Sequence, residues 1–222
     1  MIEAHDKAAI AVADNKEYKH ATLDQLRAHS RTILAVRRDT PIAANCNTAY
    51  HAIHDSGTRP LDQIWNIVIH ATEGGTSQSV ASYFTMPSAG GSTQLVTDDY
   101  ECYRCLRDDE IPWGAPGMNY HGFHIEQCGY AAWLSTMWSS THRKTLMRTA
   151  YKTALHCKKY DIPITFCFAA DLKAGKQGIT THAECTKAFG GDHTDPGAGW
   201  PRALFMGMVR SYAIAMKVKI VA

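Results

Sequence analysis

The chain has 222 residues, of which 45% are hydrophobic and 20% are charged, a composition that favours a folded domain with a packed core over a disordered chain. Its formal net charge of +2, from 23 basic and 21 acidic residues, gives no indication of nucleic acid as a partner. No apolar run approaches the roughly 20 residues that span a bilayer. The first residues also lack the basic and apolar regions of a signal peptide.

Cysteine usage indicates how the chain is stabilised. There are seven cysteines, an odd number without the dense spacing of a disulfide framework. We therefore predict reduced, mostly buried thiols. Cys102 and Cys105 form a C-x-x-C pair, but no second pair accompanies them. We interpret that spacing as coincidental rather than as a metal or redox site.

Residues 1–56 differ in pattern from the rest of the chain. Residues 22–38 have apolar side chains at helical spacing between arginines and predict an amphipathic helix, which Pro41 ends. A second short helix is expected over residues 45–54, before the Asp55-Ser56-Gly57 break. We interpret residues 1–56 as a helical appendage or linker, and residues 57–222 as the main domain.

The main domain alternates strands with helices. The apolar run at 64–69 predicts a buried central strand that ends at His70. Further strands are expected at 93–96 and 101–106, paired around Asp98-Asp99, and at 121–127 and 164–168. Helices are expected at 77–86, 141–159 and 202–217. This order predicts an α/β fold with a central mixed β-sheet flanked by helices.

Three polar segments could supply a catalytic metal site. His70 ends the central strand, and ligand sites in open α/β sheets gather beyond strand ends. His182 lies where a short strand or loop runs into a predicted helix, and Asp195 lies in a loop made rigid by proline and glycine. Each alone is also compatible with an ordinary structural role, a strand-capping histidine or a polar turn. A catalytic zinc ion needs three such ligands and one open position.

The ordered segments carry a family resemblance. His70-Ala-Thr-Glu-Gly is followed by Ile125-Glu126, by Gly178-Ile-Thr-Thr-His-Ala-Glu, and by His193-Thr-Asp-Pro-Gly. This set resembles the zinc-dependent N-acetylmuramoyl-L-alanine amidases of the type 2 family, which include phage endolysins and share their fold with peptidoglycan recognition proteins. The resemblance covers residues 57–212. It implies the amidase fold for residues 57–222, with the N-terminal helical appendage outside it.

The resemblance also implies roles for individual residues. His70, His182 and Asp195 match the family's Zn²⁺ ligands. Glu126 matches a strand carboxylate that serves as general base, and His193 matches a residue that stabilises the transition state. Because His193 lies two residues from Asp195, it stays open as an alternative third ligand.

Four further residues are expected to contact the substrate. Thr72, Trp113 and Asn119 are candidates for the walls of a groove, although Trp113 could equally belong to the core. His124 shares a strand face with Glu126, so it could contact substrate or support the site from a partly buried position. The sequence departs from the family at Gly114, where many members carry a histidine. It also has neither histidine nor tyrosine around Thr93-Gln94.

The implied activity is hydrolysis of the amide bond between N-acetylmuramic acid and the L-alanine of the peptidoglycan stem. We expect a monomeric phage endolysin without membrane insertion, which accumulates in the host cytoplasm and acts on the bacterial wall after release. Two alternatives are a non-catalytic peptidoglycan-binding module on the same fold and a zinc peptidase that cuts within the stem. The first is disfavoured because all three ligand positions carry competent side chains. The second is disfavoured because no H-E-x-x-H motif is present.

Overall fold

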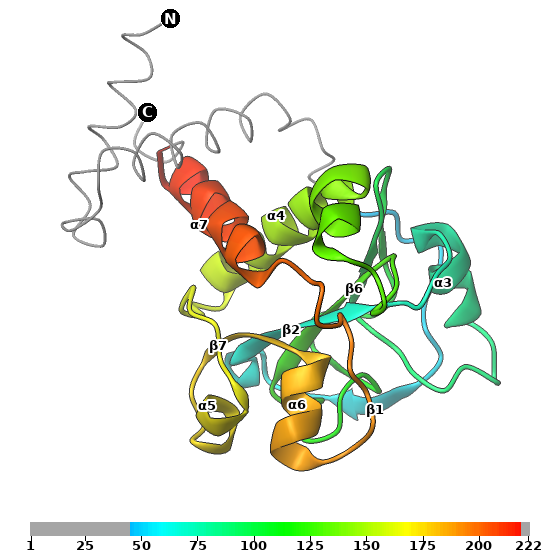
Figure 1. Cartoon of the computed structure of the whole chain (residues 1–222). Coiled ribbons are helices and arrows are strands. Elements are labelled where there is room, and N and C mark those ends of the chain that lie inside the picture. The colour runs from blue at the N-terminus through cyan, green and yellow to red at the C-terminus, as the bar shows by residue number, and fades with distance from the viewer. Residues whose placement is uncertain (1–44, 219–222) are drawn as a thin grey trace, which may run out of the picture.

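The computed structural model of the protein describes residues 45–218 (Figure 1). The helix predicted over residues 22–38, and most of the predicted appendage, lie outside the described residues. The prediction of a helix over residues 45–54 is wrong. This segment instead pairs with a strand of the main domain: Asn47 N donates to Cys102 O at 2.7 Å and Ala52 N donates to Cys105 O at 2.8 Å. These contacts attach residues 45–54 to the main domain.

A five-stranded mixed sheet forms the centre of the molecule, as predicted. Its strand order is β4 (Cys102–Arg104), β3 (Leu95–Thr97), β6 (Gly122–Gln127), β2 (Asn66–Ala71) and β7 (Gly178–Thr181). All neighbouring strands are parallel except β3 and β4, which form the predicted antiparallel pair. The sheet therefore has a common carboxyl edge where β2, β6 and β7 end.

The first face of the sheet carries the main hydrophobic core. Ile67 and Ile69 of β2, together with Phe123 and Ile125 of β6, are fully buried in it. Two long helices, α4 (Arg143–Lys159) and α7 (Arg202–Val218), cover this face (Figure 1). Because side chains alternate along a strand, the residues between these four point to the opposite face.

Shorter helices lie on the opposite face. The helix α3 (Ser77–Tyr83) packs with Phe84 onto Val96 and Tyr103. The helices α5 (Ala169–Lys173) and α6 (His182–Phe189) lie beside β7. A small antiparallel sheet of β1 (Asp55–Thr58) and β5 (Glu110–Pro112), a 3-10 turn at Leu61–Gln63 and a π-helical turn at Met137–Thr141 complete the described part.

Side-chain caps determine where two of these helices begin. Thr76 and Ser79 form a reciprocal capping box at the start of α3, so the predicted helix begins where expected. Thr181 Oγ1 accepts from Glu184 N at 3.4 Å, which starts α6 directly after β7 and makes His182 its first residue.

The strand predicted at 164–168 is wrong. Only Phe166 forms a bridge there, opposite Ile179. The chain then turns into α5, because the Asp171 carboxylate accepts from Phe168 N at 3.1 Å and caps the helix start.

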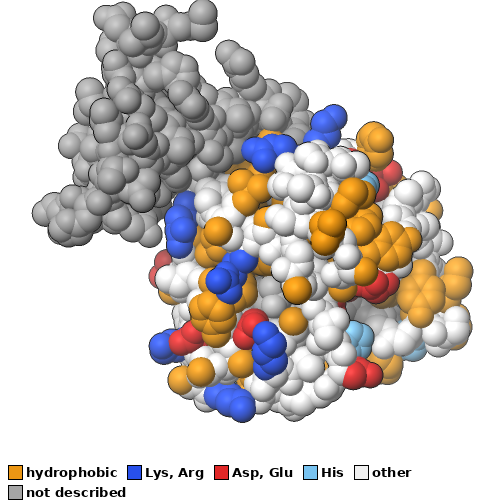
Figure 2. All heavy atoms as spheres, in the orientation of Figure 1, with side chains coloured by type: hydrophobic (Ala, Val, Ile, Leu, Met, Phe, Trp, Pro, Cys, Tyr) orange, Lys and Arg blue, Asp and Glu red, His pale blue; other side chains and the backbone are white. Residues whose placement is uncertain are grey.

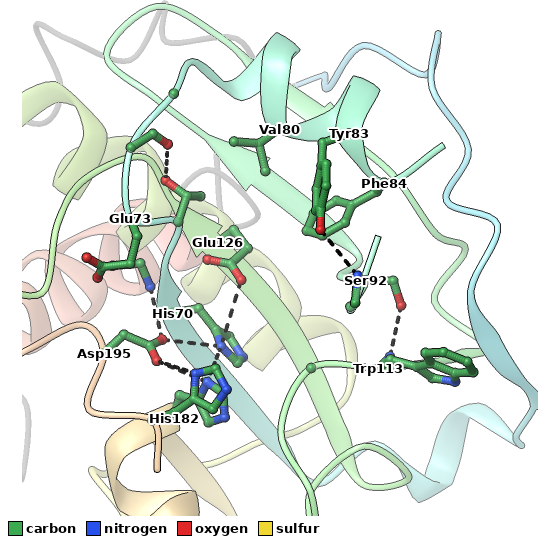
Figure 3. A pocket seen from close by; sticks show the side chains of 18 of the residues that line it. His70, Glu73, Val80, Tyr83, Phe84, Ser92, Trp113, Glu126, His182 and Asp195 are labelled. Carbon is green, nitrogen blue, oxygen red and sulfur yellow. Dashed lines mark hydrogen bonds and ion pairs between the residues drawn. The ribbon is translucent and has the colours of Figure 1, made fainter. Parts of the chain in front are cut away.

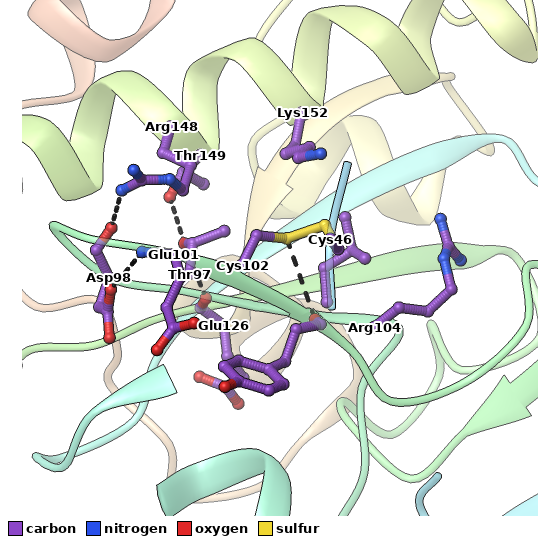
Figure 4. Close-up of a disulfide and its surroundings, with 12 residues drawn as sticks. Cys46, Thr97, Asp98, Glu101, Cys102, Arg104, Glu126, Arg148, Thr149 and Lys152 are labelled. Carbon is purple, nitrogen blue, oxygen red and sulfur yellow. Dashed lines mark hydrogen bonds between the residues drawn. A yellow bond between two sulfur atoms is a disulfide. The ribbon is translucent and has the colours of Figure 1, made fainter. Parts of the chain in front are cut away.

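The prediction that all cysteines are reduced is also wrong. Cys46 and Cys102 form a disulfide that joins residues 45–54 to the edge strand β4 (Figure 4). The two cysteines are 56 positions apart in the sequence, so no local pattern indicated that they pair. The other five cysteines are buried free thiols, including Cys105, so the C-x-x-C spacing carries no site of its own. None of the helices in residues 45–218 is long and apolar enough to cross a membrane.

Candidate active site

His70, His182 and Asp195 converge at the carboxyl edge of the parallel strands (Figure 3). His70 is near the end of β2, His182 follows β7, and Asp195 lies in the loop that precedes α7. One ligand atom from each lies within 4.8 Å of the others, and all three residues are buried. The three predicted ligands thus come from neighbouring rigid elements.

Their donor atoms are spaced as a metal ion requires. His70 Nδ1 lies 3.1 Å from His182 Nδ1 and 3.4 Å from Asp195 Oδ2, and His182 Nδ1 lies 3.1 Å from Asp195 Oδ1. Tetrahedral zinc with bonds of about 2.1 Å separates its donors by about 3.4 Å. Two imidazole nitrogens and a carboxylate are also a common zinc donor set, so the residues present fit this metal.

Asp195 is held in its charged form. Burial alone would raise the pKa of its carboxyl, but the hydrogen bond from His182 and the adjacent His70 ring outweigh burial and hold that pKa far below its ordinary value. Ala71 N also donates to Asp195 Oδ2, at 3.2 Å. Burial lowers the pKa of His70, so its ring favours the neutral form that binds metals.

Glu126 lies beside this group on β6, where it is the register partner of His70. Its Oε1 is 3.9 Å from His70 Nδ1, and its Oε2 is buried with no hydrogen-bond partner among the described residues. Burial first, and then the negative charges of Asp195 and Glu73, raise the pKa of Glu126 well above its ordinary value. The carboxyl group therefore readily accepts a proton.

His193 lies at the mouth of the site. Its ring stacks on that of His182, with centroids 4.1 Å apart, and its Nδ1 is 3.6 Å from Asp195 Oδ1. The His193 side chain is 59% exposed, whereas Asp195 is buried. The structure groups Asp195, rather than His193, with the two histidines.

A cleft of about 510 Å³ opens in front of these residues. Val80, Tyr83 and Phe84 line one side together with Ser92 and Trp113, and His70, His182 and Asp195 lie across from them (Figure 3). In the space-filling view, histidine and acidic side chains gather around a hollow beside α3 (Figure 2). The cleft therefore combines an apolar and aromatic wall with a polar base.

Two of the four predicted substrate residues line this cleft. Thr72 donates from Oγ1 to Gly74 O at 2.6 Å, which shapes the loop after β2. Trp113 is 43% exposed and stacks on His54 with ring centroids 4.7 Å apart, so its indole is held at the surface rather than in the core. Both positions allow contact with a bound molecule.

The other two predicted residues lie elsewhere. His124 is fully buried behind His70, so the prediction of direct substrate contact is wrong. Asn119 does not line the cleft; its Oδ1 accepts from Gly114 N and Ala115 N and holds the loop after β5. Sequence reasoning missed Glu73 and Tyr83. Glu73 could have been found from its place in the loop after His70, but the direction of Tyr83 depends on how α3 packs.

Comparisons with known proteins show which family and which solved structures the chain is similar to. The family model for N-acetylmuramoyl-L-alanine amidase matches residues 60–198. A search of curated protein sequences finds no match.

Among solved structures, the Staphylococcus aureus hydrolase AmiA in complex with its ligand is 15% identical with a TM-score of 0.67; the match covers 85% of this chain and 93% of that chain. A selenomethionine AmpD derivative is 18% identical with a TM-score of 0.54, covering 75% and 96% of the two chains. A mutant endolysin from Bacillus subtilis is 16% identical with a TM-score of 0.51, covering 75% and 99%. These likenesses show a shared fold. The family model matches more than half of the length of this chain, and the chain therefore belongs to the N-acetylmuramoyl-L-alanine amidase family.

Proposed function

We propose that the protein is a zinc-dependent peptidoglycan amidase, which hydrolyses the bond between N-acetylmuramic acid and the L-alanine of the stem peptide. The family supports amidase activity on peptidoglycan. The observation that carries the proposal is the buried group of His70, His182 and Asp195 at the base of an open cleft, with Glu126 beside it.

In this proposal His70, His182 and Asp195 hold the zinc ion. When bound, zinc supplies a Lewis acid that makes water nucleophilic near neutral pH. Glu126 takes the proton from the attacking water and delivers it to the leaving amine, a role suited to its raised pKa. His193 donates a hydrogen bond to the substrate carbonyl oxygen as that oxygen becomes negative. Thr72 and Trp113 contact the bound glycopeptide.

The products of digestion test this function. Purified peptidoglycan incubated with the protein should release free stem peptides that begin at L-alanine, identified by mass spectrometry. Peptides cut within the stem would indicate the peptidase alternative, and binding without release would indicate a non-catalytic module. Either outcome would overturn the proposal.

Removing one ligand tests the metal site. We expect His182→Ala to lose bound zinc and amide hydrolysis, because two ligands hold the ion much more weakly than three. A chelator should inactivate the wild-type protein, and added zinc should restore it. His51→Ala is the matched control, because this exposed histidine lies outside the cleft. Full activity of His182→Ala would refute the site.

We further propose that the protein acts as a monomeric phage endolysin, active on the wall after release from the host cytoplasm. The family resemblance supports this role, as does the fold shared with an endolysin from Bacillus subtilis. Expression in host cells should cause lysis only when a pore-forming protein is co-expressed, and sedimentation should give the mass of one chain. Lysis without the pore protein would contradict the proposed route.

A further inference from the structure

His124 lies directly behind His70 and contacts it through one ring nitrogen. His70 Nε2 and His124 Nδ1 are 3.0 Å apart, and the ring centroids are 5.1 Å apart. The second nitrogen, His124 Nε2, lies 3.3 Å from Met118 O. A chain of two hydrogen bonds therefore connects a backbone carbonyl to the far side of a candidate metal ligand.

The chemistry of these atoms determines where the protons lie. A carbonyl oxygen only accepts, so His124 Nε2 carries the proton of the bond to Met118 O. In a neutral imidazole the other nitrogen is then an acceptor, so His124 Nδ1 accepts and His70 Nε2 donates. His124 is neutral in this arrangement because its ring is fully buried and contacts no carboxylate.

The consequence falls on the other nitrogen of His70. With its proton on Nε2, the neutral His70 ring presents a bare lone pair on Nδ1. This nitrogen faces His182 Nδ1 and Asp195 Oδ2. The lone pair thus points at the position where the three candidate ligands converge.

The surrounding backbone leaves room for the His124 ring in this orientation. A Cβ added at Gly114 or Gly122 would lie well inside van der Waals contact of the His124 ring nitrogens. The His124 backbone N–H donates to Gln94 Oε1 at 2.8 Å, which ties this part of β6 to β3. The two glycines therefore leave room for the ring, and the glutamine holds the backbone of His124.

We propose that His124 is a positioning residue that sets the tautomer of His70, so that Nδ1 is ready to bind metal before the ion arrives. The inference rests on the proposed zinc site, but it concerns the metal-free protein and does not depend on which bond is hydrolysed.

The metal-free wild-type protein provides the first test. Nitrogen-15 NMR of its histidine rings should show His70 and His124 protonated at Nε2 and bare at Nδ1. His70 protonated at Nδ1 would overturn the proposal, whatever the catalytic activity of the protein. This measurement needs no variant, so it does not depend on any substitution folding correctly.

Zinc affinity of two variants provides the second test. His124→Phe keeps a ring but has no acceptor, whereas His124→Asn keeps an acceptor close to the position of Nδ1. Loss of an outer partner of a metal-binding histidine typically weakens metal binding by about 10–100-fold. We expect that loss for His124→Phe in competition with a chelator, and a loss of only a few fold for His124→Asn.

A matched control separates this role from simple packing. His156 is also buried, and it stacks on Phe123 on the opposite face of the sheet. His156→Phe should leave zinc affinity unchanged. If His124→Phe binds zinc like wild type, or His124→Asn loses as much affinity as His124→Phe, the acceptor has no role and the proposal fails. If the amidase assay alone fails, the proposed function is wrong, but the NMR and zinc-affinity results still decide the role of His124.

Discussion

Glu126 has surroundings that oppose its negative charge. The side chain is only 16% exposed, lies near the negative charges of Asp195 and Glu73, and has a buried Oε2 without a partner among the described residues. A buried polar atom without a partner is costly, so it indicates a group kept for chemistry rather than for stability. In the proposed reaction Glu126 Oε2 has a hydrogen-bond partner while the carboxyl group takes the proton from water and delivers it to the leaving amine.

Substitution by the isosteric amide tests that role. Glu126→Gln keeps the volume and cannot accept the proton, so kcat should fall by about 10²–10⁴-fold while zinc content stays at one per chain. Stopped assays on peptidoglycan and metal analysis give the two values. Glu73→Gln is the control, because Glu73 also lines the cleft but accepts a hydrogen bond from Ala131 N. A kcat for Glu126→Gln within tenfold of wild type would remove Glu126 from the mechanism.

A second pair of variants distinguishes the third ligand from its neighbour. Asp195 is buried between the two histidines, whereas His193 is mostly exposed. We expect Asp195→Ala to lose zinc and His193→Ala to keep zinc with a kcat reduced by about 10²-fold, since it loses a transition-state donor. The reverse pattern in metal analysis would make His193 the ligand.

The long elements of the fold were predictable because each buries one continuous face. The apolar run of β2, the antiparallel pair β3 and β4, and the periodic α4 and α7 all lie close to their predicted positions. The segment at 45–54 and the bridge at Phe166 were not predictable, since their conformations depend on distant partners in β4 and β7. Tertiary contacts outweigh local propensity there.

The site residues likewise include some that could be predicted from the sequence and some that could not. The three ligand candidates lie at element ends, where residue type and order are informative. His124 was correctly placed on the same strand face as Glu126. The alternation along a strand does not indicate how far a side chain lies from the surface, so the burial of His124 could not be predicted. Asn119 was misplaced because the direction of a loop side chain depends on the loop's own hydrogen bonds.

The disulfide gives a prediction at the scale of elements. Cys46–Cys102 closes a long loop and holds residues 45–54 against β4. Cys46→Ser should lower the free energy of unfolding by about 2–4 kcal/mol, mainly because the unfolded chain gains freedom. Urea unfolding with and without reductant measures this, and reductant should not destabilise the variant further. An unchanged unfolding midpoint would show that the bond does not form in solution.

At the scale of the whole molecule, Asp108 joins the loop before β5 to the end of α4. Its carboxylate accepts from Arg104, from Tyr160 and, at 2.6 Å, from Lys159 Nζ. Burial alone would raise the pKa of Asp108, but the bonds from Lys159 and Tyr160 and the charge of Arg104 outweigh it and lower the pKa to about 2. The charged form is therefore favoured in the folded protein.

This shift predicts a pH-dependent stability. Because the pKa of Asp108 is lower in the folded than in the unfolded chain, its contribution of about 2 kcal/mol is present above pH 4 and disappears as pH falls toward 2. Asp108→Asn should lose about that amount in urea unfolding at pH 7 and approach wild type at pH 2. The control Asp109→Asn removes a surface pair with Arg107 and should change stability by less than about 1 kcal/mol. A pH-independent difference would contradict this assignment.

The pairing of β2 with β6 also affects what a preparation of this protein contains. His70 and Glu126 are register partners, and their neighbours Ile69 and Ile125 point into the opposite core. A slip of one residue in β2 would move His70 into that core and place an apolar side chain at the base of the cleft. Such a molecule would lack His70, one of the three proposed metal ligands. A partly active form with shifted strands is therefore not expected. The metal content per mole of purified protein would then measure the fraction of chains whose central strands are correctly paired.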